Sequence, residues 1–472
     1  MSRIRGIVAV LIFAGLPGLG TPQERPTEAV DLSGAIRMAL ARNRELARSA
    51  FGSSINALDV IRAESAFRLD VRPELYLNAE GGRTVAGGGL SVSQKLPWGT
   101  QTSVEGFLAG SSGDGSALRQ KTLQVEISQP LFRNFGALVQ REPVVQARQN
   151  YRAALRTLEM EKSALALRVI ESYESILQLG RRVLVEQASV DRMEKLVRLT
   201  RAKEVLGRTT RVDTLRAELL RGQAQFRLET IRESFSFEQR DFAELLGADP
   251  ETVFDLKPTV LLEVNVPPLE ESLKTALQNR LDYAQALQDG QDAARGIRIA
   301  GRKLLPGLNL VARKSWTEGD ALVSAPTSND HWAVGLSLDM NVNLKEERAA
   351  LEQARLFGSS VDLNASIVEL AVAREVNQQR AAYRRARSAL SISERNKDLA
   401  SSRRKLAQRL FELGRSDPFS VTDSEETFLE AENQWLSARA EASLAGYRLL
   451  YVLGTLVETP DDLKPRSASV NR

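Results

Sequence analysis

The sequence contains no cysteine and a single histidine, His331, among its 472 residues. Without cysteine, the chain cannot form disulfides, zinc–thiolate sites, iron–sulfur clusters or a lipid-modified N-terminal cysteine. A single histidine argues against Ser-His-Asp catalysis and multi-histidine metal sites. Phosphate-loop, nucleophile-elbow, zinc-protease and dinucleotide-binding motifs are also missing. We therefore expect no enzymatic activity, no metal site and no other cofactor.

The chain also lacks an excess of charge of one sign and a second long apolar run. Its 64 Lys and Arg residues face 60 Asp and Glu residues, a net charge of +4. This balance does not favour nucleic acid as a partner. After the N-terminus no stretch reaches 18 apolar residues, so a membrane location would require a closed β-barrel.

The first 20 residues have the layout of a secretory signal peptide. Arg3 and Arg5 precede an apolar or glycine run over residues 6–16, and small residues follow as far as Gly20. This run is shorter than the roughly 20 residues that span a bilayer, although an uncleaved anchor is the alternative. We expect cleavage near Gly20 and export from the cytoplasm.

Proline is absent from three long windows, 144–249, 327–417 and 419–459, which favours long helices. Between Leu155 and Val197, ten of thirteen positions at alternating spacings of three and four are apolar, which is typical of a coiled coil. A shorter seam of the same kind recurs at every seventh residue in the later window, at Ile392, Leu399, Leu406 and Leu413.

Two glycine-centred breaks interrupt these windows. Gly207 and Gly414 each fit the left-handed C-terminal cap of a helix, and Thr or Ser residues that can cap the next helix follow. Pro418 is compatible with a first helical turn. Each break therefore predicts the tip of a long α-helical hairpin.

The two hairpins are related by an internal duplication. A shift of 207 residues aligns Leu206-Gly207-Arg208 with Leu413-Gly414-Arg415, and a shift of 237 aligns the segment around Ile36 with that around Leu273. Two unrelated coiled coils could share a period, but matched turns and leading helices favour duplication. We place the signal peptide at 1–20, the repeats at 21–247 and 269–456, a linker at 248–268 and a disordered tail at 457–472.

Both repeats contain segments with strand character between the leading helix and the hairpin. Apolar and polar residues alternate over 123–128 and 332–344, and the first repeat has an additional hairpin at 90–108. We expect strands at about 71–130 and 306–344, and helical hairpins at about 144–247 and 346–454. The alternation fits a transmembrane barrel and equally a soluble, half-buried sheet.

Three of the four tryptophans, Trp98, Trp316 and Trp332, lie in these strand segments. Tryptophan is enriched at membrane–water interfaces, so the three residues are candidates for the borders of a lipid-facing band. Ordinary packing within a sheet is the alternative.

The sequence resembles the TolC-like outer-membrane efflux proteins. The resemblance rests on the signal peptide, the helix at 31–43, the segment 128–136 that leaves a strand, and both Leu-Gly-Arg turns. It implies a mainly α fold with a β-barrel portion, in which strands of two tandem repeats build a barrel shared by three copies. The helical hairpins would form a periplasmic tunnel. Four strands per copy is typical of this family, and the additional hairpin puts that number in doubt.

The resemblance implies an exit duct in the outer membrane of a Gram-negative bacterium, acting in tripartite efflux or type I secretion. Its partners would be two further copies, outer-membrane lipid, a periplasmic adaptor protein and, through that adaptor, an inner-membrane pump. The adaptor would dock at Gly207, Arg208, Gly414 and Arg415, although helix capping alone explains both glycines. The alternative is a soluble periplasmic coiled-coil adaptor or scaffold, but such a chain usually has one hairpin.

The resemblance also implies a gate of acidic residues just beyond the tips. Asp213 follows Gly207 by six residues, and Asp423 follows Gly414 by nine, whereas Ser420 stands where a relative often has Asp. Threefold symmetry would make each aspartate a ring of carboxylates that attracts cations. The alternative is that both only stabilise the first turns of their helices. The sequence does not specify the exported substrate.

Overall fold

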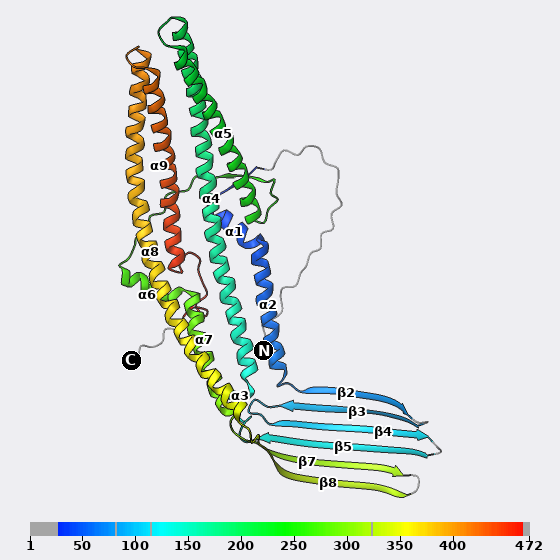
Figure 1. The fold of residues 1–472 in the computed structure, drawn as a ribbon. Coiled ribbons are helices and arrows are strands. Elements are labelled where there is room, and N and C mark those ends of the chain that lie inside the picture. Colours follow the sequence, from blue (N-terminus) through cyan, green and yellow to red (C-terminus); the bar gives the residue numbers. More distant parts are fainter. Residues whose placement is uncertain (1–26, 81–82, 114–115, 322–323, 466–472) are drawn as a thin grey trace.

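The computed structural model describes residues 27–80, 83–113, 116–321 and 324–465. The molecule is elongated, with a sheet at one end and two long helical hairpins reaching to the other (Figure 1). The expected signal peptide and residues 466–472 of the expected tail lie outside the described residues. The described part of that tail lies against the helices, and Leu463 is buried there.

The first repeat runs from a short strand through two helices, four strands and a short helix to the first hairpin, α4 and α5. The bounds are β1 Thr27–Val30, α1 Leu32–Arg42, α2 Arg44–Ser65, β2 Asp70–Glu80, β3 Arg83–Lys95, β4 Gln101–Gly113, β5 Ser116–Pro130, α3 Ala137–Gln140, α4 Glu142–Val205 and α5 Arg211–Leu245.

The second repeat has the same order with two strands fewer, and it ends in the hairpin of α8 and α9. The bounds are β6 Val253–Leu256, α6 Leu269–Asn279, α7 Leu281–Arg302, β7 Gly307–Ala321, β8 Ser324–Asp339, α8 Lys345–Glu412 and α9 Pro418–Val452. At 64 and 68 residues, α4 and α8 are each about 100 Å long. The predicted mainly α fold of two repeats is confirmed. Strand β8 ends at Asp339, before the alternating pattern does.

Six antiparallel strands form the large sheet, in the order β2-β3-β4-β5-β7-β8. The pairing of β5 with β7 joins the two repeats. The additional hairpin, β3 and β4, lies inside this order between β2 and β5. Two aromatic rings fasten it to β2: Tyr76 and Phe107 stack at 5.3 Å over Gly87. A Cβ atom at Gly87 would lie 2.7 Å from the Tyr76 ring, so only glycine leaves room for this stack.

The short helices meet the hairpins at equivalent points in the two repeats. Helix α5 ends at Gly247, whose Cβ position is 2.5 Å from the carbonyl oxygen of Arg42, between α1 and α2. Helix α9 ends at Gly454, whose Cβ position is 3.0 Å from that of Asn279, between α6 and α7. Both glycines have a positive φ of 71°. The sequence predicted one leading helix per repeat, and the structure has a pair.

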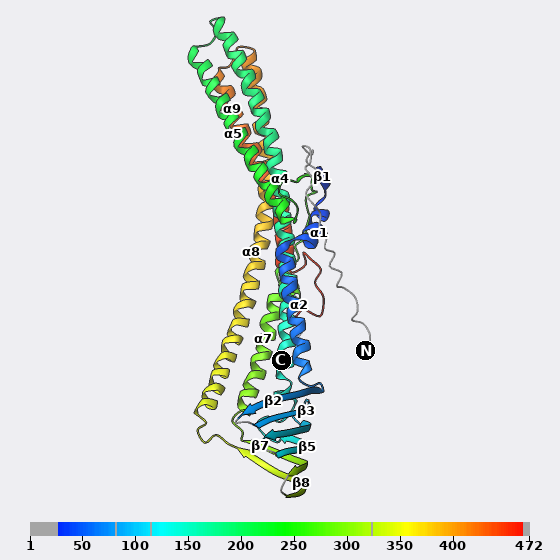
Figure 2. The same cartoon turned by 90° about the vertical axis from the view of Figure 1, so that its right-hand side faces the viewer.

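The core lies where the short helices cover the lower part of each hairpin. Tyr173 of α4 is fully buried, and its single hydroxyl hydrogen is shared between the carbonyl oxygens of Lys257 (2.8 Å) and Val30 (3.1 Å). It thereby ties α4 to the two-stranded parallel sheet of β1 and β6, which lies beside the middle of the hairpins (Figure 2). Burial raises the pKa of Tyr173 to about 12.

The predicted seam on α4 is buried over much of its length, but the seam on α8 is not. Leu165, Val169 and Val197 of α4 are buried. The four leucine and isoleucine residues of the α8 seam are all exposed, and Ala400 and Ala407, one residue further on, are buried instead. Within one copy, the predicted coiled-coil seam on α8 therefore does not face α9. Small residues let α9 approach closely, and the large ones face outwards.

Candidate functional site: the strand sheet and the hairpin tips

The sheet has one apolar face that is exposed. The strands pair so that apolar residues of neighbouring strands lie on the same face of the sheet. Val104, for example, lies opposite both Val92 and Val125. Large exposed side chains on this face are Leu75, Leu77, Leu90, Val104, Leu108, Leu123, Ile127, Leu310, Trp316, Trp332, Val334, Leu336 and Leu338. An apolar surface spanning six strands is much larger than a soluble monomer exposes, and it suits contact with lipid.

Tryptophans lie towards both ends of the apolar face. Trp98 is in the β3–β4 turn at the helical end, where its carbonyl oxygen accepts a hydrogen bond from the Gly136 amide (2.9 Å). Trp316 lies beyond the middle of β7 towards the distal end, and Trp332 lies at the middle of β8. One step beyond Trp316, this face carries the ion pair Lys121–Glu318 (3.7 Å). The ion pair of Lys314 with Asp330 also lies on this face next to both tryptophans, so the apolar surface contains charged residues at the level of the tryptophans as well as beyond them.

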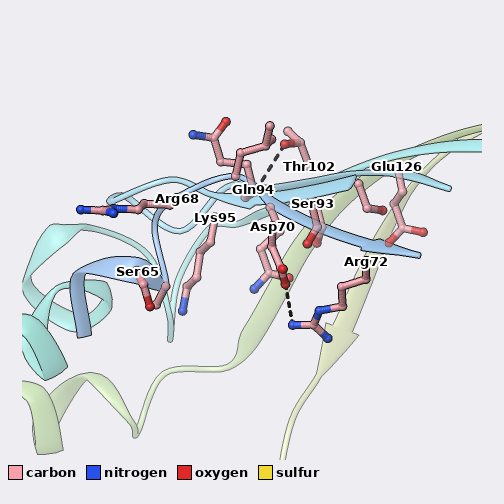
Figure 3. A pocket seen from close by; sticks show the side chains of 14 residues that line it. Ser65, Arg68, Asp70, Arg72, Ser93, Gln94, Lys95, Thr102 and Glu126 are labelled. Atoms are coloured by element: carbon pink, nitrogen blue, oxygen red, sulfur yellow. Dashed lines mark hydrogen bonds and ion pairs between the residues drawn. The ribbon is translucent and has the colours of Figure 1, made fainter. Parts of the chain in front are cut away.

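The opposite face of the sheet is polar. Arg313 of β7 donates two hydrogen bonds to Glu126 of β5, at 2.9 and 2.7 Å. Beside Glu126, at the helical end, the face bounds an open hollow of about 680 Å³ (Figure 3). Its charged residues are Arg68, Asp70, Arg72, Lys95 and Glu126. Among the described residues, no group of three or more carboxylate or histidine side chains could hold a metal ion.

At the far end of the molecule, Gly207 and Gly414 close the hairpins in the same way. Their φ angles are positive, 66° at Gly207 and 71° at Gly414. The amide of the next residue, Arg208 or Arg415, donates a hydrogen bond of 2.8 Å to a carbonyl oxygen of the preceding helix. A Cβ atom at either glycine would contact nothing within 4 Å. The tips are therefore sterically open, unlike the buried ends at Gly247 and Gly454.

Asp213 belongs to a capping box at the start of α5. Its carboxylate accepts hydrogen bonds from the Thr210 hydroxyl (2.6 Å) and amide (3.1 Å) and from the Thr209 hydroxyl (3.0 Å). These bonds, the Thr210 hydroxyl above all, lower the pKa of Asp213. The carboxylate is thus charged at neutral pH and held by its own helix.

Asp423 lies one turn further into its helix, α9, and pairs with Arg403 of α8. Arg403 also donates to the Thr427 hydroxyl (3.0 Å). Both charged side chains are about half exposed, so water screens this pair strongly. The N-terminal cap of α9 is Asp417, which accepts from the Ser420 amide (3.0 Å). Asp213 and Asp423 therefore occupy different helical positions, and the structure does not bring them together.

Near the tips, a buried charged cluster that the sequence did not indicate connects the two hairpins. Glu425 of α9 pairs with Arg192 of α4 at 2.5 Å and with Arg404 of α8 at 3.9 Å. Arg404 also lies over the Phe428 ring, 3.9 Å from its centre. Higher up, the Lys203 ammonium donates to the Phe411 carbonyl oxygen at the end of α8 (2.7 Å). Both contacts join the first hairpin to the second.

Comparison with known proteins supports the relation of this fold to membrane channels. A family model described as outer membrane efflux protein matches residues 272–455. Residues 272–455 therefore match the efflux protein family that the sequence resembles. Nodulation protein T of Rhizobium leguminosarum bv. trifolii is 26% identical over 164 residues, which is 34% of each chain. The match thus spans about a third of that relative.

Two solved structures share the fold of this chain over nearly its whole length. CusC, in a study of transmembrane channel formation, is 15% identical with a TM-score of 0.70, covering 91% of this chain and 93% of its own. The Campylobacter jejuni CmeC outer membrane channel is 11% identical with a TM-score of 0.71, covering 94% and 92%. Both comparisons show that the chain has the fold of these channels, with a sheet at one end and long helical hairpins at the other.

Proposed function

We propose that three copies of this efflux protein form an exit duct through the outer membrane, continued across the periplasm by a tunnel of helices. The observation that carries the proposal is the sheet with one apolar and one polar face, joined directly to hairpins about 100 Å long. A closed barrel satisfies every strand edge in lipid, and its polar face then encloses water. Substrates would pass without touching lipid.

Two unpartnered flanks of the chain support a ring of copies. On one flank, α2 leads into β2; on the other, β8 leads into α8 (Figure 1). Large apolar side chains are exposed on α2 at Phe51, Ile55, Leu58 and Ile61, and on α8 at Leu356, Phe357, Leu363, Ile367 and Leu370. One 18-residue window of α8 has a mean hydropathy of 1.3 and is only 17% buried. In a ring of copies, the α2 flank of one copy would cover the α8 flank of the next.

The hairpin tips are the proposed docking site for a periplasmic adaptor protein, through which an inner-membrane pump would supply energy. Support comes from the open space around Gly207 and Gly414, which lets a partner helix approach the backbone closely, and from the adjacent Arg208 and Arg415. A photo-crosslinking residue at Arg415 should capture a periplasmic coiled-coil protein in cells. The same residue at Leu184, exposed on α4 away from the tip, should not.

The gate is proposed to involve Asp213 and Asp423, each forming a ring of three carboxylates near the tips. The Arg403–Asp423 pair modifies this picture, since the arginine offsets part of the charge at that ring. Asp213 has no cationic partner among its hydrogen bonds. We therefore assign the greater part of the cation preference to Asp213. Trp98, Trp316 and Trp332 are proposed to lie at the two membrane–water interfaces.

Single-channel recording in planar bilayers tests the proposed function. The detergent-purified protein should give small, cation-preferring steps, and Asp213→Ala and Asp423→Ala should reduce that preference or enlarge the steps. Asp398→Ala, an exposed aspartate of α8 away from the tip, is the matched control and should change neither. A protein that stays soluble without detergent and never conducts would refute the exit duct in favour of a soluble adaptor or scaffold.

A further inference from the structure

We infer that three copies of this chain close a barrel of eighteen strands, rather than twelve, so that its lumen is as wide as the helical tunnel. The inference rests on the trimer proposed above and goes beyond it. Within the described residues each copy contributes six strands to one continuous sheet. The hairpin of β3 and β4 supplies the two strands beyond the four that the resemblance implies.

The position of β3 and β4 in the sheet makes them part of the barrel wall. They are inserted between β2 and β5, and within the described residues β2 is joined to the sheet only through β3. The β2–β3 ladder runs from Asp70 to Glu80, and the β4–β5 ladder from Gln101 to Gly113. A hairpin that folded away as an external flap would break both ladders and leave β2 detached.

The side chains of the additional hairpin also match those of a membrane wall. Both strands have 13 residues, enough for the roughly 9–11 that a tilted strand needs to cross a bilayer. Val104 and Leu108 lie on the apolar face, and Glu105 lies on the polar face with Tyr76 and Phe107. The stack of Tyr76 on Phe107 thus fastens β4 to β2 from the lumen side.

The helical end of the hairpin is fixed to the segment that links β5 with α4. Gly99 has a φ of 110°, and a Cβ atom there would lie 2.8 Å from Pro130. The Thr100 hydroxyl hydrogen bonds to the Gln129 side chain, and the Trp98 carbonyl oxygen accepts from Gly136. The turn is therefore packed against the base of the sheet, where a freely moving flap would have no such contacts.

Circumference provides an independent argument. With strands about 4.8 Å apart and tilted by about 40°, eighteen strands give a circumference of about 110 Å and a backbone diameter of about 36 Å. Twelve strands give only about 75 Å and 24 Å. Below the hairpin tips each copy contributes α2, α4, α7 and α8 side by side. Twelve helices packed about 8–10 Å apart need about 95–120 Å. Eighteen strands therefore match the tunnel without a constriction.

The functional consequence is that the outer-membrane portion does not limit the size of the exported substrate. The lumen cross-section scales with the square of strand number, so the backbone of an eighteen-stranded barrel encloses about twice the area of a twelve-stranded one. Size selection would then take place at the tips. The duct is suited to bulky cargo delivered through an open tip.

Lipid quenching of single-cysteine variants tests whether the hairpin is in the wall. Because the chain has no cysteine, each variant carries one label. In vesicles containing a quencher attached to lipid acyl chains, label at Val104→Cys should lose most of its fluorescence, and label at Glu105→Cys should keep it. Leu336→Cys and Gly335→Cys are the matched pair on β8, which belongs to the wall in a barrel of twelve strands as well as in one of eighteen. Gly335 has space for a side chain.

The outcomes separate this inference from the proposed function. Quenching at Leu336 without quenching at Val104 would place the hairpin outside the wall and overturn the eighteen-stranded barrel, with the exit duct unaffected. Absence of quenching at both residues would overturn the membrane location and, with it, this inference. Quenching at Val104 and Leu336, without quenching at Glu105 and Gly335, supports the eighteen-stranded barrel.

Disulfide crosslinking between copies tests closure through β2 and β8. Gly335→Cys on β8 is combined in turn with Arg72→Cys, Glu74→Cys or Asn78→Cys on β2, all on the polar face. At least one combination should give covalently linked copies on a denaturing gel after oxidation, and each single variant should give no closed ring. If the protein is trimeric in detergent but no combination crosslinks, closure by these two edges is refuted.

Discussion

Replacing Glu425 by Gln should loosen the contact between the two hairpins near their tips. Glu425 is 5% exposed and is the carboxylate shared by Arg192 and Arg404. Gln has nearly the same shape but no charge, so the two guanidinium groups would lose the carboxylate that they share. Arg192 Nη2 and Arg404 Nε have no hydrogen-bond partner even in the native cluster. Glu432 is the other carboxylate whose charge acts on both arginines, and it offsets part of the loss.

The expected magnitude follows from burial. Breaking a buried ion pair costs about 3–5 kcal/mol. Because the arginine side chains are 25% and 18% exposed, water recovers part of that cost, and we expect about 2–3 kcal/mol. Local opening of the upper hairpins should therefore be about 30- to 150-fold more frequent, at about 1.4 kcal/mol per factor of ten.

Amide hydrogen exchange of the detergent-purified protein, followed by mass spectrometry, measures this opening. Peptides of α4 and α9 around the cluster should exchange faster by the stated factor, and peptides around Tyr173 should be unchanged. Asp423→Asn is the control, since it breaks an exposed pair worth at most about 1 kcal/mol, or about fivefold. If Glu425→Gln accelerates exchange no more than Asp423→Asn does, the assignment of Glu425 as the main electrostatic link is wrong.

Three further predictions concern single side chains. Burial raises the pKa of Glu432, so its charged form destabilises the fold above that raised pKa; Glu432→Gln should raise the thermal midpoint at pH 7 and leave it nearly unchanged at pH 4. Thr210→Ala should lower the free energy of opening of the first turn of α5 by about 1 kcal/mol, measured by amide hydrogen exchange. Because its hydroxyl lowers the pKa of Asp213 below 3.8, the difference should persist above that value and shrink as the pH falls through the lowered pKa. Gly247→Ala should lower the thermal midpoint far more than Gly207→Ala, whose strain alone costs about 1–2 kcal/mol, because only Gly247 faces a backbone oxygen at 2.5 Å; equal effects would contradict the contact.

The features that the sequence predicts well are those carried by local pattern. Gly207 and Gly414 end their helices because glycine adopts a positive φ without strain, and the following Thr210 and Asp417 cap the next helices. These signals depend on neighbouring residues, so one chain is enough to find them. The duplication then extends each signal to the other repeat.

Features that depend on distant residues were not predictable in the same way. Glu425 and Arg192 are 233 positions apart, and each has the spacing of a solvent-exposed charge on a coiled coil. The stripe at Leu399 and Leu406 has a heptad period but faces outwards, because a period does not specify which neighbour will cover it. Three consecutive glycines, 87–89, interrupt the alternation of β3, so the hairpin predicted at 90–108 is shorter than the observed β3 and β4.

The contact of Gly247 with Arg42 marks a joint between α5 and the helix pair α1 and α2. Helix α4 runs unbroken past this level, whereas α5 stops and α2 begins, end against end, linked by one hydrogen bond from Asn43 to the Leu245 carbonyl oxygen (3.0 Å). The second repeat has the same arrangement at Gly454. Such a joint transmits compression but resists rotation weakly. Because α4 and α8 run unbroken past these joints, a movement of the tips reaches the sheet along these two helices, whereas α5 and α9 can turn relative to the short helices below them without any helix breaking.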